Sequence, residues 1–137
     1  QKGDVMRRST RSITGAVLAA GLLLGGAGGA QAVTSNTAFD GIMNRFQQSR
    51  YFQDQEKTRA NTASNIEFTG IGGTYAANVK AQNRQSGDQY AEQKGLGRNT
   101  IYNIPHSTPK GQKTRLILTN DTWTSVTVSI NGWYRTN

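Results

Sequence analysis

Hydrophobic and polar residues alternate along most of the C-terminal half of the chain. Ile66 and Phe68 alternate with polar neighbours, and residues 75–82 and 126–130 repeat the pattern. An alternation with a period of two is typical of a strand with one buried face. We therefore predict that residues 63–137 form an antiparallel β domain. With its five or six strands, this mainly β domain is expected to be a small β-sandwich or a partly open barrel.

The C-terminal residues determine how two aromatic side chains are expected to point. Asn131-Gly132 is a preferred two-residue hairpin turn, and it directly follows an alternating segment. Across such a turn, Trp133 lies opposite the apolar face of the preceding strand and shares that face. The pattern therefore predicts that Trp133 joins the core, whereas Tyr134 lies on the polar face together with Trp123.

Residues 37–52 follow a different period. Phe39, Met43 and Phe46 recur at the spacing of three and four residues that is typical of an amphipathic helix, and a polar stretch follows them. We predict a short helix here and assign residues 33–62 to an N-terminal helix and a polar linker. The helix either packs on the sheet of its own domain or docks into another protein. In the second case the three apolar residues are candidates for binding a partner.

The N-terminal part of the chain has the three-part layout of a secretory signal peptide. A basic start leads into an apolar run and then into a small-residue tail that ends Ala30-Gln31-Ala32. The A-x-A spacing predicts that residues 6–32 are removed and that the mature chain begins at Val33. We therefore expect a secreted protein without a transmembrane anchor. The alternative is a retained anchor, which the many glycines of the apolar run disfavour.

Charge and cysteine content narrow the class of protein further. Residues 1–32 carry four of the 16 basic and one of the 8 acidic residues, so the net charge falls from +8 to +5 when 105 of the 137 residues remain. The cations are scattered, which favours weak attraction to anionic surfaces such as bacterial wall polymers and argues against specific nucleic-acid binding. The absence of cysteine excludes disulfides, thiol catalysis and Cys-based metal sites.

Residues that could carry catalysis are sparse. His106 is the only histidine, and it lies between two prolines with no nucleophile elbow in the chain and no acid beside it. The carboxylates show no metal-ligand spacing. The glycine cluster at residues 70–73 lacks the lysine of a phosphate-binding loop, so we predict that it connects two strands. We therefore expect no catalytic site, no metal and no cofactor.

Aromatic side chains are the remaining candidates for function. Trp and Tyr rings stack on flat partners and supply much of the binding energy at protein interfaces. Trp123 and Tyr134 are the leading candidates, with Tyr102 upstream. The sequence thus predicts a secreted, non-enzymatic binding protein with an extracellular glycan or protein partner. A secreted antibacterial toxin or toxin-complex subunit is the second hypothesis, and a small secreted hydrolase is the third.

Overall fold

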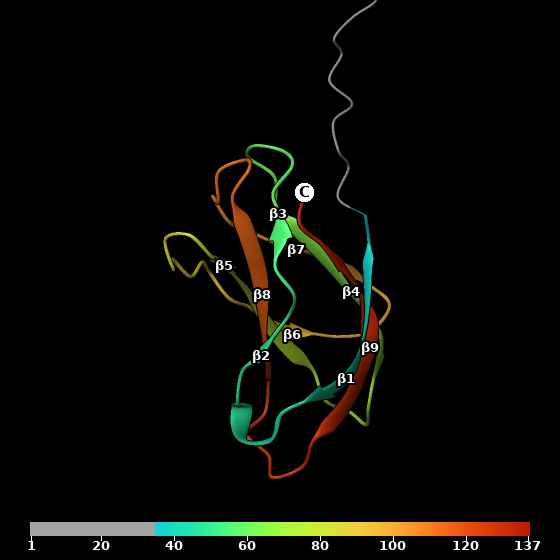
Figure 1. Cartoon of the computed structure of the whole chain (residues 1–137). Helices are drawn as coiled ribbons and strands as arrows, with labels where there is room; N and C mark the ends of the chain where they lie inside the picture. The colour runs from blue at the N-terminus through green and yellow to red at the C-terminus, as the bar shows by residue number, and fades with distance from the viewer. Residues whose placement is uncertain (1–34) are drawn as a thin grey trace, which may run out of the picture. The chain divides into compact units, whose positions relative to one another are not determined.

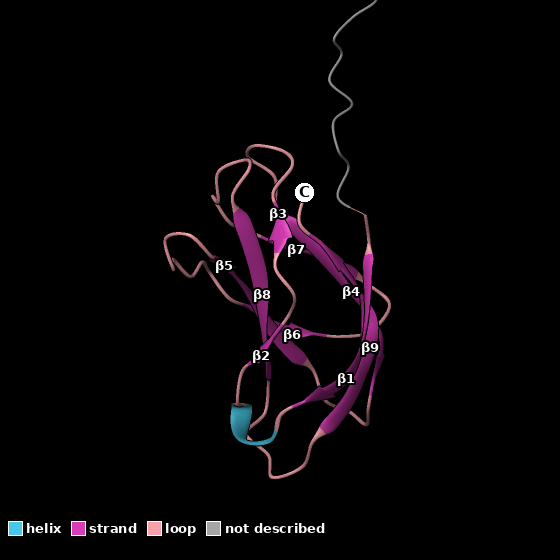
Figure 2. Ribbon diagram, in the orientation of Figure 1, coloured by secondary structure: helices cyan, strands magenta, loops and turns pink. Residues whose placement is uncertain are grey.

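The computed structural model describes residues 35–137, so the predicted signal peptide (residues 6–32) and its cleavage site lie outside the described residues (Figure 1). Strands dominate the described part, which contains a single turn of 3-10 helix (Figure 2). The strands are β1 (Thr37–Met43), β2 (Arg50–Tyr51), β3 (Gln55–Glu56), β4 (Ser64–Ile71), β5 (Ala77–Asn83), β6 (Gln93–Leu96), β7 (Ile101–Ile104), β8 (Lys113–Asn120) and β9 (Val128–Arg135), and the 3-10 turn is η1 (Arg45–Gln47).

The strands form two sheets, and neither of them closes into a barrel. Sheet A has the order β1-β9-β4-β7, and sheet B has the order β2-β8-β5-β6 with β3 added to one end of β8. All the pairings are antiparallel. The prediction of a mainly β, antiparallel fold is therefore confirmed.

One hydrophobic core lies between the two sheets. The alternation read from the sequence holds in the middle of β4, where Ile66 and Phe68 are fully buried. In β5, Val79 is fully buried as expected, but the polar residues Asn78 and Gln82 of the opposite face are buried too. Burying a large apolar side chain contributes roughly 1.5–3 kcal/mol, so this core is the main source of stability in a chain without disulfides. The cluster includes Met43, Phe52, Ile66, Phe68, Ile71, Val79, Leu96, Ile104, Leu116, Leu118, Val128, Ile130 and Tyr134.

The predicted helix over residues 37–52 is wrong, because this segment supplies strands to both sheets. β1 pairs along its whole length with β9, and β2 pairs with β8. The apolar spacing fits a strand equally well, since Phe39 and Met43 both point towards the core while Ile42 stays 44% exposed. Gly41, at φ 136°, has a backbone conformation that no helix contains. The segment is thus part of the sheets and not a separable arm.

The predicted hairpin turn at Asn131-Gly132 is also wrong, because β9 continues straight through it. Without the turn, the period of two runs unbroken along the strand. It places Tyr134 on the same inward face as Val128, and Tyr134 is only 3% exposed. Trp133 instead points outward, where its indole Nε1 donates a hydrogen bond to Glu67 Oε2 at 2.7 Å. The expected faces of these two aromatic residues are therefore exchanged.

Candidate functional site

Phe46 and Trp123 form an exposed aromatic pair at one end of the two sheets. Phe46 belongs to η1, and Trp123 belongs to the loop that joins β8 to β9 (Figure 1). Their ring centroids lie 4.9 Å apart, with the ring planes tilted by 42°. Trp123 is 67% exposed and Phe46 is 37% exposed. Two of the sequence-predicted binding residues are thus brought together, although 37–52 is not a helix.

The backbone around this pair is constrained. Phe46 has φ 56° and Gln47 has φ 53°, so both residues occupy the left-handed region, which costs a residue with a side chain about 1–2 kcal/mol. Two hydrogen bonds between the loops hold them there. The Phe46 N–H donates to the Thr124 carbonyl oxygen at 2.7 Å, and Gln47 Nε2 donates to the Asp121 carbonyl oxygen at 3.1 Å. The exposed rings therefore stand on an ordered support. We call residues 44–48 and 121–127 together the aromatic tip.

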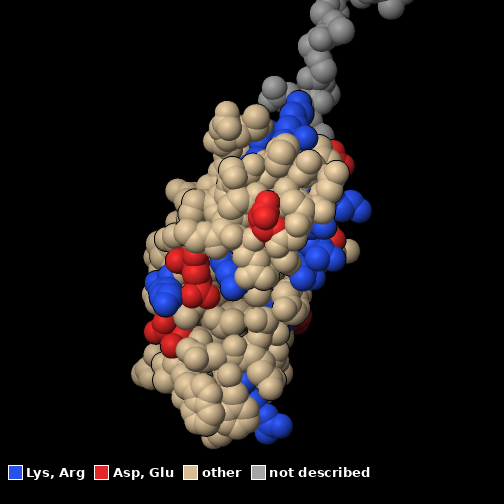
Figure 3. Space-filling model, turned by 90° about the vertical axis from the view of Figure 1, so that its left-hand side faces the viewer, with Lys and Arg blue, Asp and Glu red and all other residues tan. Residues whose placement is uncertain are grey.

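The aromatic tip carries little charge. Its ionisable side chains are Arg45, whose guanidinium carbon lies 5.6 Å from the Phe46 ring centroid, and Asp121. Val126, which is 47% exposed, adds apolar surface. Figure 3 shows that acidic and basic residues mix over the upper and middle parts of the visible face, whereas its lower end is mostly uncharged and carries one basic side chain. An exposed apolar patch with few charges is typical of a surface that binds a partner.

The other predicted binding residues do not join the aromatic tip. Met43 and Tyr134 are buried in the core, so the expected exposure of Tyr134 is wrong, and Met43 follows the alternative in which it packs within its own domain. Burial also raises the pKa of Tyr134, whose hydroxyl donates a hydrogen bond to the Gln53 carbonyl oxygen at 3.1 Å. Phe39 and Tyr102 are half-buried and pack against the core cluster. The strand geometry turns these side chains away from a partner.

His106 is partly buried and hydrogen-bonded to a serine of β4. Its Nε2 lies 2.8 Å from Ser64 Oγ, and the two groups are hydrogen-bonded. Its Nδ1 is buried without a hydrogen-bond partner within the described residues, so a proton added there would have no acceptor. Burial, followed by the positive charge of Lys57, lowers the pKa of His106 to about 4.

This Ser–His pair lacks the surroundings of a hydrolytic site. Ser64 is 0% exposed, so a substrate carbonyl cannot reach its hydroxyl in this conformation. The nearby charged group is Lys57, a cation, where a catalytic triad has a carboxylate on the second histidine nitrogen. The geometry therefore fits a buried structural hydrogen bond better than a nucleophile.

Lys57 is a fully buried lysine at the same end of the sheets as His106. Its Nζ donates hydrogen bonds to the carbonyl oxygen and the hydroxyl of Thr62. The Thr62 hydroxyl in turn donates to the carbonyl oxygens of Arg59 and Asn137, at 3.2 and 3.0 Å. Burial lowers the pKa of Lys57. We call Lys57, Thr62, Ser64 and His106 the polar end.

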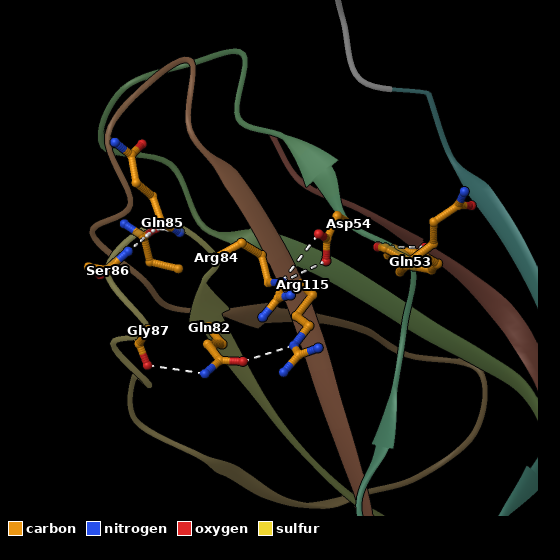
Figure 4. Close-up of polar contacts among 10 residues, drawn as sticks. Gln53, Asp54, Gln82, Arg84, Gln85, Ser86, Gly87 and Arg115 are labelled. Atoms are coloured by element: carbon orange, nitrogen blue, oxygen red, sulfur yellow. Dashed lines mark hydrogen bonds and ion pairs between the residues drawn. The ribbon is translucent and has the colours of Figure 1, made fainter.

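The outer surface of sheet B carries a network of long polar side chains. Gln82 donates through Nε2 to the Gly87 carbonyl oxygen at 3.1 Å and accepts from Arg115 Nε at 2.8 Å, while Arg84 pairs with Asp54 (Figure 4). The Arg115 guanidinium carbon also lies 4.1 Å from the centroid of Tyr51, which is 54% exposed. Since these groups already bond to one another, the network is explained by the stability of the sheet surface.

Among the described residues, no helix is long and apolar enough to span a bilayer. Within the same residues, His, Asp and Glu do not gather in groups of three or more that would hold a metal ion. Comparisons with protein-family models, curated proteins and solved structures found no match to this chain.

Proposed function

We propose that the protein is a secreted, non-enzymatic β-sandwich protein that binds an extracellular glycan or protein through the aromatic tip. The observation that carries this proposal is the exposed Phe46–Trp123 pair on a constrained backbone. Left-handed residues with side chains cost stability and persist where the surrounding structure enforces them, which is common at binding sites. Here the strained backbone at Phe46 and Gln47 holds the Phe46 ring beside Trp123, with both rings exposed to water. Folding stability alone does not favour this arrangement.

The chemistry of the pair suits both kinds of partner. Each ring covers part of one face of the other, and the high exposure of Trp123 leaves indole surface for a partner. An indole face stacks on the apolar face of a sugar ring, and Trp is also enriched among the residues that dominate protein interfaces. The neutral surroundings favour an uncharged contact in either case.

Secretion is the second part of the proposal and rests on the sequence of residues 6–32. The test is mass spectrometry of the protein purified from culture medium, which should find a chain that begins at Val33. A secreted form that retains the apolar run before Ala30 would contradict the predicted signal-peptide cleavage.

The binding experiment uses the protein purified from culture medium as bait. It is exposed in parallel to an array of neutral and charged glycans and to proteins of the culture supernatant. Trp123→Ala should lose the partner that the wild-type protein retains. Tyr51→Ala is the matched control, because it removes another exposed aromatic ring outside the aromatic tip. Equal retention by wild type and Trp123→Ala would refute the proposed surface. Growth inhibition of a competing strain, if seen, would favour the toxin hypothesis instead.

A further inference from the structure

A groove of about 400 Å³ lies over three strands of sheet A, β1, β9 and β4. The register places Asp40, Asn131 and Gly70 side by side across these strands. The neighbouring outward-facing position of β9 is Ser129, and Gly72 lies beside it. The Gly72 N–H donates a hydrogen bond to the Ser129 carbonyl oxygen at 2.9 Å. Asp40 and Asn131 alternate with inward-facing residues, so they point to the outer face. The volume falls within the range of small-molecule sites.

Two glycines make room for the polar side chains that line this groove. A Cβ on Gly70 would lie 2.1 Å from Asn131 Oδ1, and a Cβ on Gly72 would lie 2.9 Å from Ser129 Oγ. Neither glycine has a positive φ, so the backbone conformation alone does not require glycine at these positions. Glycine weakens a strand, and it often marks either a β-bulge, such as the register shift between Phe68 and Gly70, or a place where a ligand approaches the backbone closely. The missing side chains leave the space to the polar groups of Asn131 and Ser129.

The polar groups of the groove are available to a ligand. The side chains of Asp40, Asn131 and Ser129 make no hydrogen bond or ion pair with another group of residues 35–137. A carboxylate accepts hydrogen bonds, and an amide and a hydroxyl both donate and accept them. This set complements a ligand that carries neighbouring hydroxyl groups.

Other classes of ligand fit the groove less well. Asp40 is its only charged lining residue and disfavours anions, but the Arg50 guanidinium donates to the carbonyl oxygens of Asp40 and Ile42 beside the groove and weakens this repulsion. A single carboxylate is too few for a divalent cation, which takes several oxygen ligands. Trp133 lies two residues beyond Asn131 on the same face of β9, roughly 7 Å away along the strand. Its ring is positioned by the hydrogen bond to Glu67 and adds an aromatic surface beside the groove.

We infer that this groove binds the ring of a neutral saccharide. Asp40, Asn131 and Ser129 hold its hydroxyl groups, in the space that Gly70 and Gly72 leave to the side chains of Asn131 and Ser129. The inference rests on the proposed binding function, yet it involves none of the residues of the aromatic tip. The two proposals can therefore fail separately.

The test is a titration of the isotope-labelled protein, purified from culture medium, followed by amide NMR. The probes are glucose, galactose, mannose and N-acetylglucosamine, with glucuronic acid as the anionic comparison. We expect saturable shifts of the groove amides with at least one neutral sugar and weaker shifts with glucuronic acid. Gly72→Ala should abolish them. Gly97→Ala is the matched control, because Gly97 also lacks a positive φ and its Cβ would meet only Tyr102 Oη at 3.8 Å.

A second variant covers the case in which Gly72→Ala fails to fold. Asp40→Asn keeps the shape of an exposed side chain and removes the charged acceptor, so affinity for the sugar should fall about tenfold or more. No saturable shift with any neutral sugar overturns the inference, and so does unchanged affinity in Asp40→Asn. Amide shifts confined to Phe46 and Trp123 also overturn the inference that the groove binds the sugar, and they support the aromatic tip as the glycan site.

Discussion

The two ends of the molecule depart from the usual burial of side chains in opposite ways. The aromatic tip exposes apolar rings, whereas the polar end buries a lysine, a serine and part of a histidine. At the polar end the protein itself satisfies most of the buried groups, since Lys57 bonds to Thr62 and Ser64 bonds to His106. At the aromatic tip, Trp123 stays 67% exposed despite its contact with Phe46.

This difference separates a structural feature from a functional one. Buried polar groups that bond to one another stabilise a single arrangement of the chain, so their presence needs no ligand. The left-handed backbone at Phe46 lowers stability, and the exposed ring of Trp123 gains little from burial, so selection for folding alone does not explain the pair. The polar end should therefore respond to tests of stability, and the aromatic tip to tests of binding.

The largest expected effect comes from placing a charge on either side of the boundary between aromatic tip and core. Val128→Asp should destabilise the fold by several kcal/mol, because Val128 is 3% exposed and the carboxylate would have no partner there. Val126→Asp should change the free energy of unfolding by less than about 0.5 kcal/mol, because Val126 is 47% exposed. Urea denaturation measures both. Similar losses in the two variants would show that the aromatic tip is structural.

The next effect is a loss of stability in acid that originates at the polar end. His106 has a folded-state pKa of about 4, whereas its ordinary value is 6.5. Between these values the unfolded chain binds a proton that the folded chain does not, so stability falls as the pH falls through this window. The loss should be roughly 1–2 kcal/mol, after allowance for solvent screening at a partly exposed group.

His106→Gln isolates this contribution, because glutamine stays neutral over the whole window. Denaturant midpoints measured from neutral pH down to pH 4 should fall less steeply for the variant than for the wild type. Parallel pH curves for the two proteins would mean that His106 titrates normally in the folded state. The polar end would then not account for the loss of stability in acid.

The smallest effect concerns backbone strain at the aromatic tip. Phe46→Gly should be more stable than Phe46→Ala by about 1 kcal/mol, because glycine adopts φ 56° without steric cost and alanine does not. At an ordinary strand position the order is reversed. Thermal unfolding of the two variants gives the sign of the difference in their stability. A more stable alanine variant would show that residue 46 is not held in the left-handed region.

Sequence patterns predicted an antiparallel β domain over residues 63–137, but they missed the strands β1, β2 and β3 and the faces of part of β9. The alternation of apolar and polar residues located the strand that contains Ile66 and Phe68, because the direction of side chains along a strand follows from the local period of two. It failed at Asn131-Gly132, since a preferred turn sequence was overruled by the pairing of β9 with β1 on one side and β4 on the other. That pairing joins residues far apart in the chain, so no local signal reports it, and the faces of Trp133 and Tyr134 were exchanged as a result.

The candidate site was predictable in part. The polar neighbours of Trp123 predicted that it is exposed. Phe46 was a candidate for binding because of a predicted amphipathic helix over residues 37–52, which the strand at 37–43 replaces. Their contact depends on two loops that meet only in the folded chain. The groove beside Asp40 had one visible signal, the glycines at 70 and 72, which the sequence reading assigned to a strand connection alone.

The most direct test of the central claim is the affinity of the wild-type protein and of Trp123→Ala for the partner that the binding experiment identifies. Isothermal titration should show a loss of about 1–3 kcal/mol for the variant, which is typical of an aromatic residue at the centre of a binding surface. Its thermal unfolding should match the wild type, because Trp123 is 67% exposed. Unchanged affinity in Trp123→Ala, with the fold intact, would contradict the assignment of the aromatic tip as the binding site.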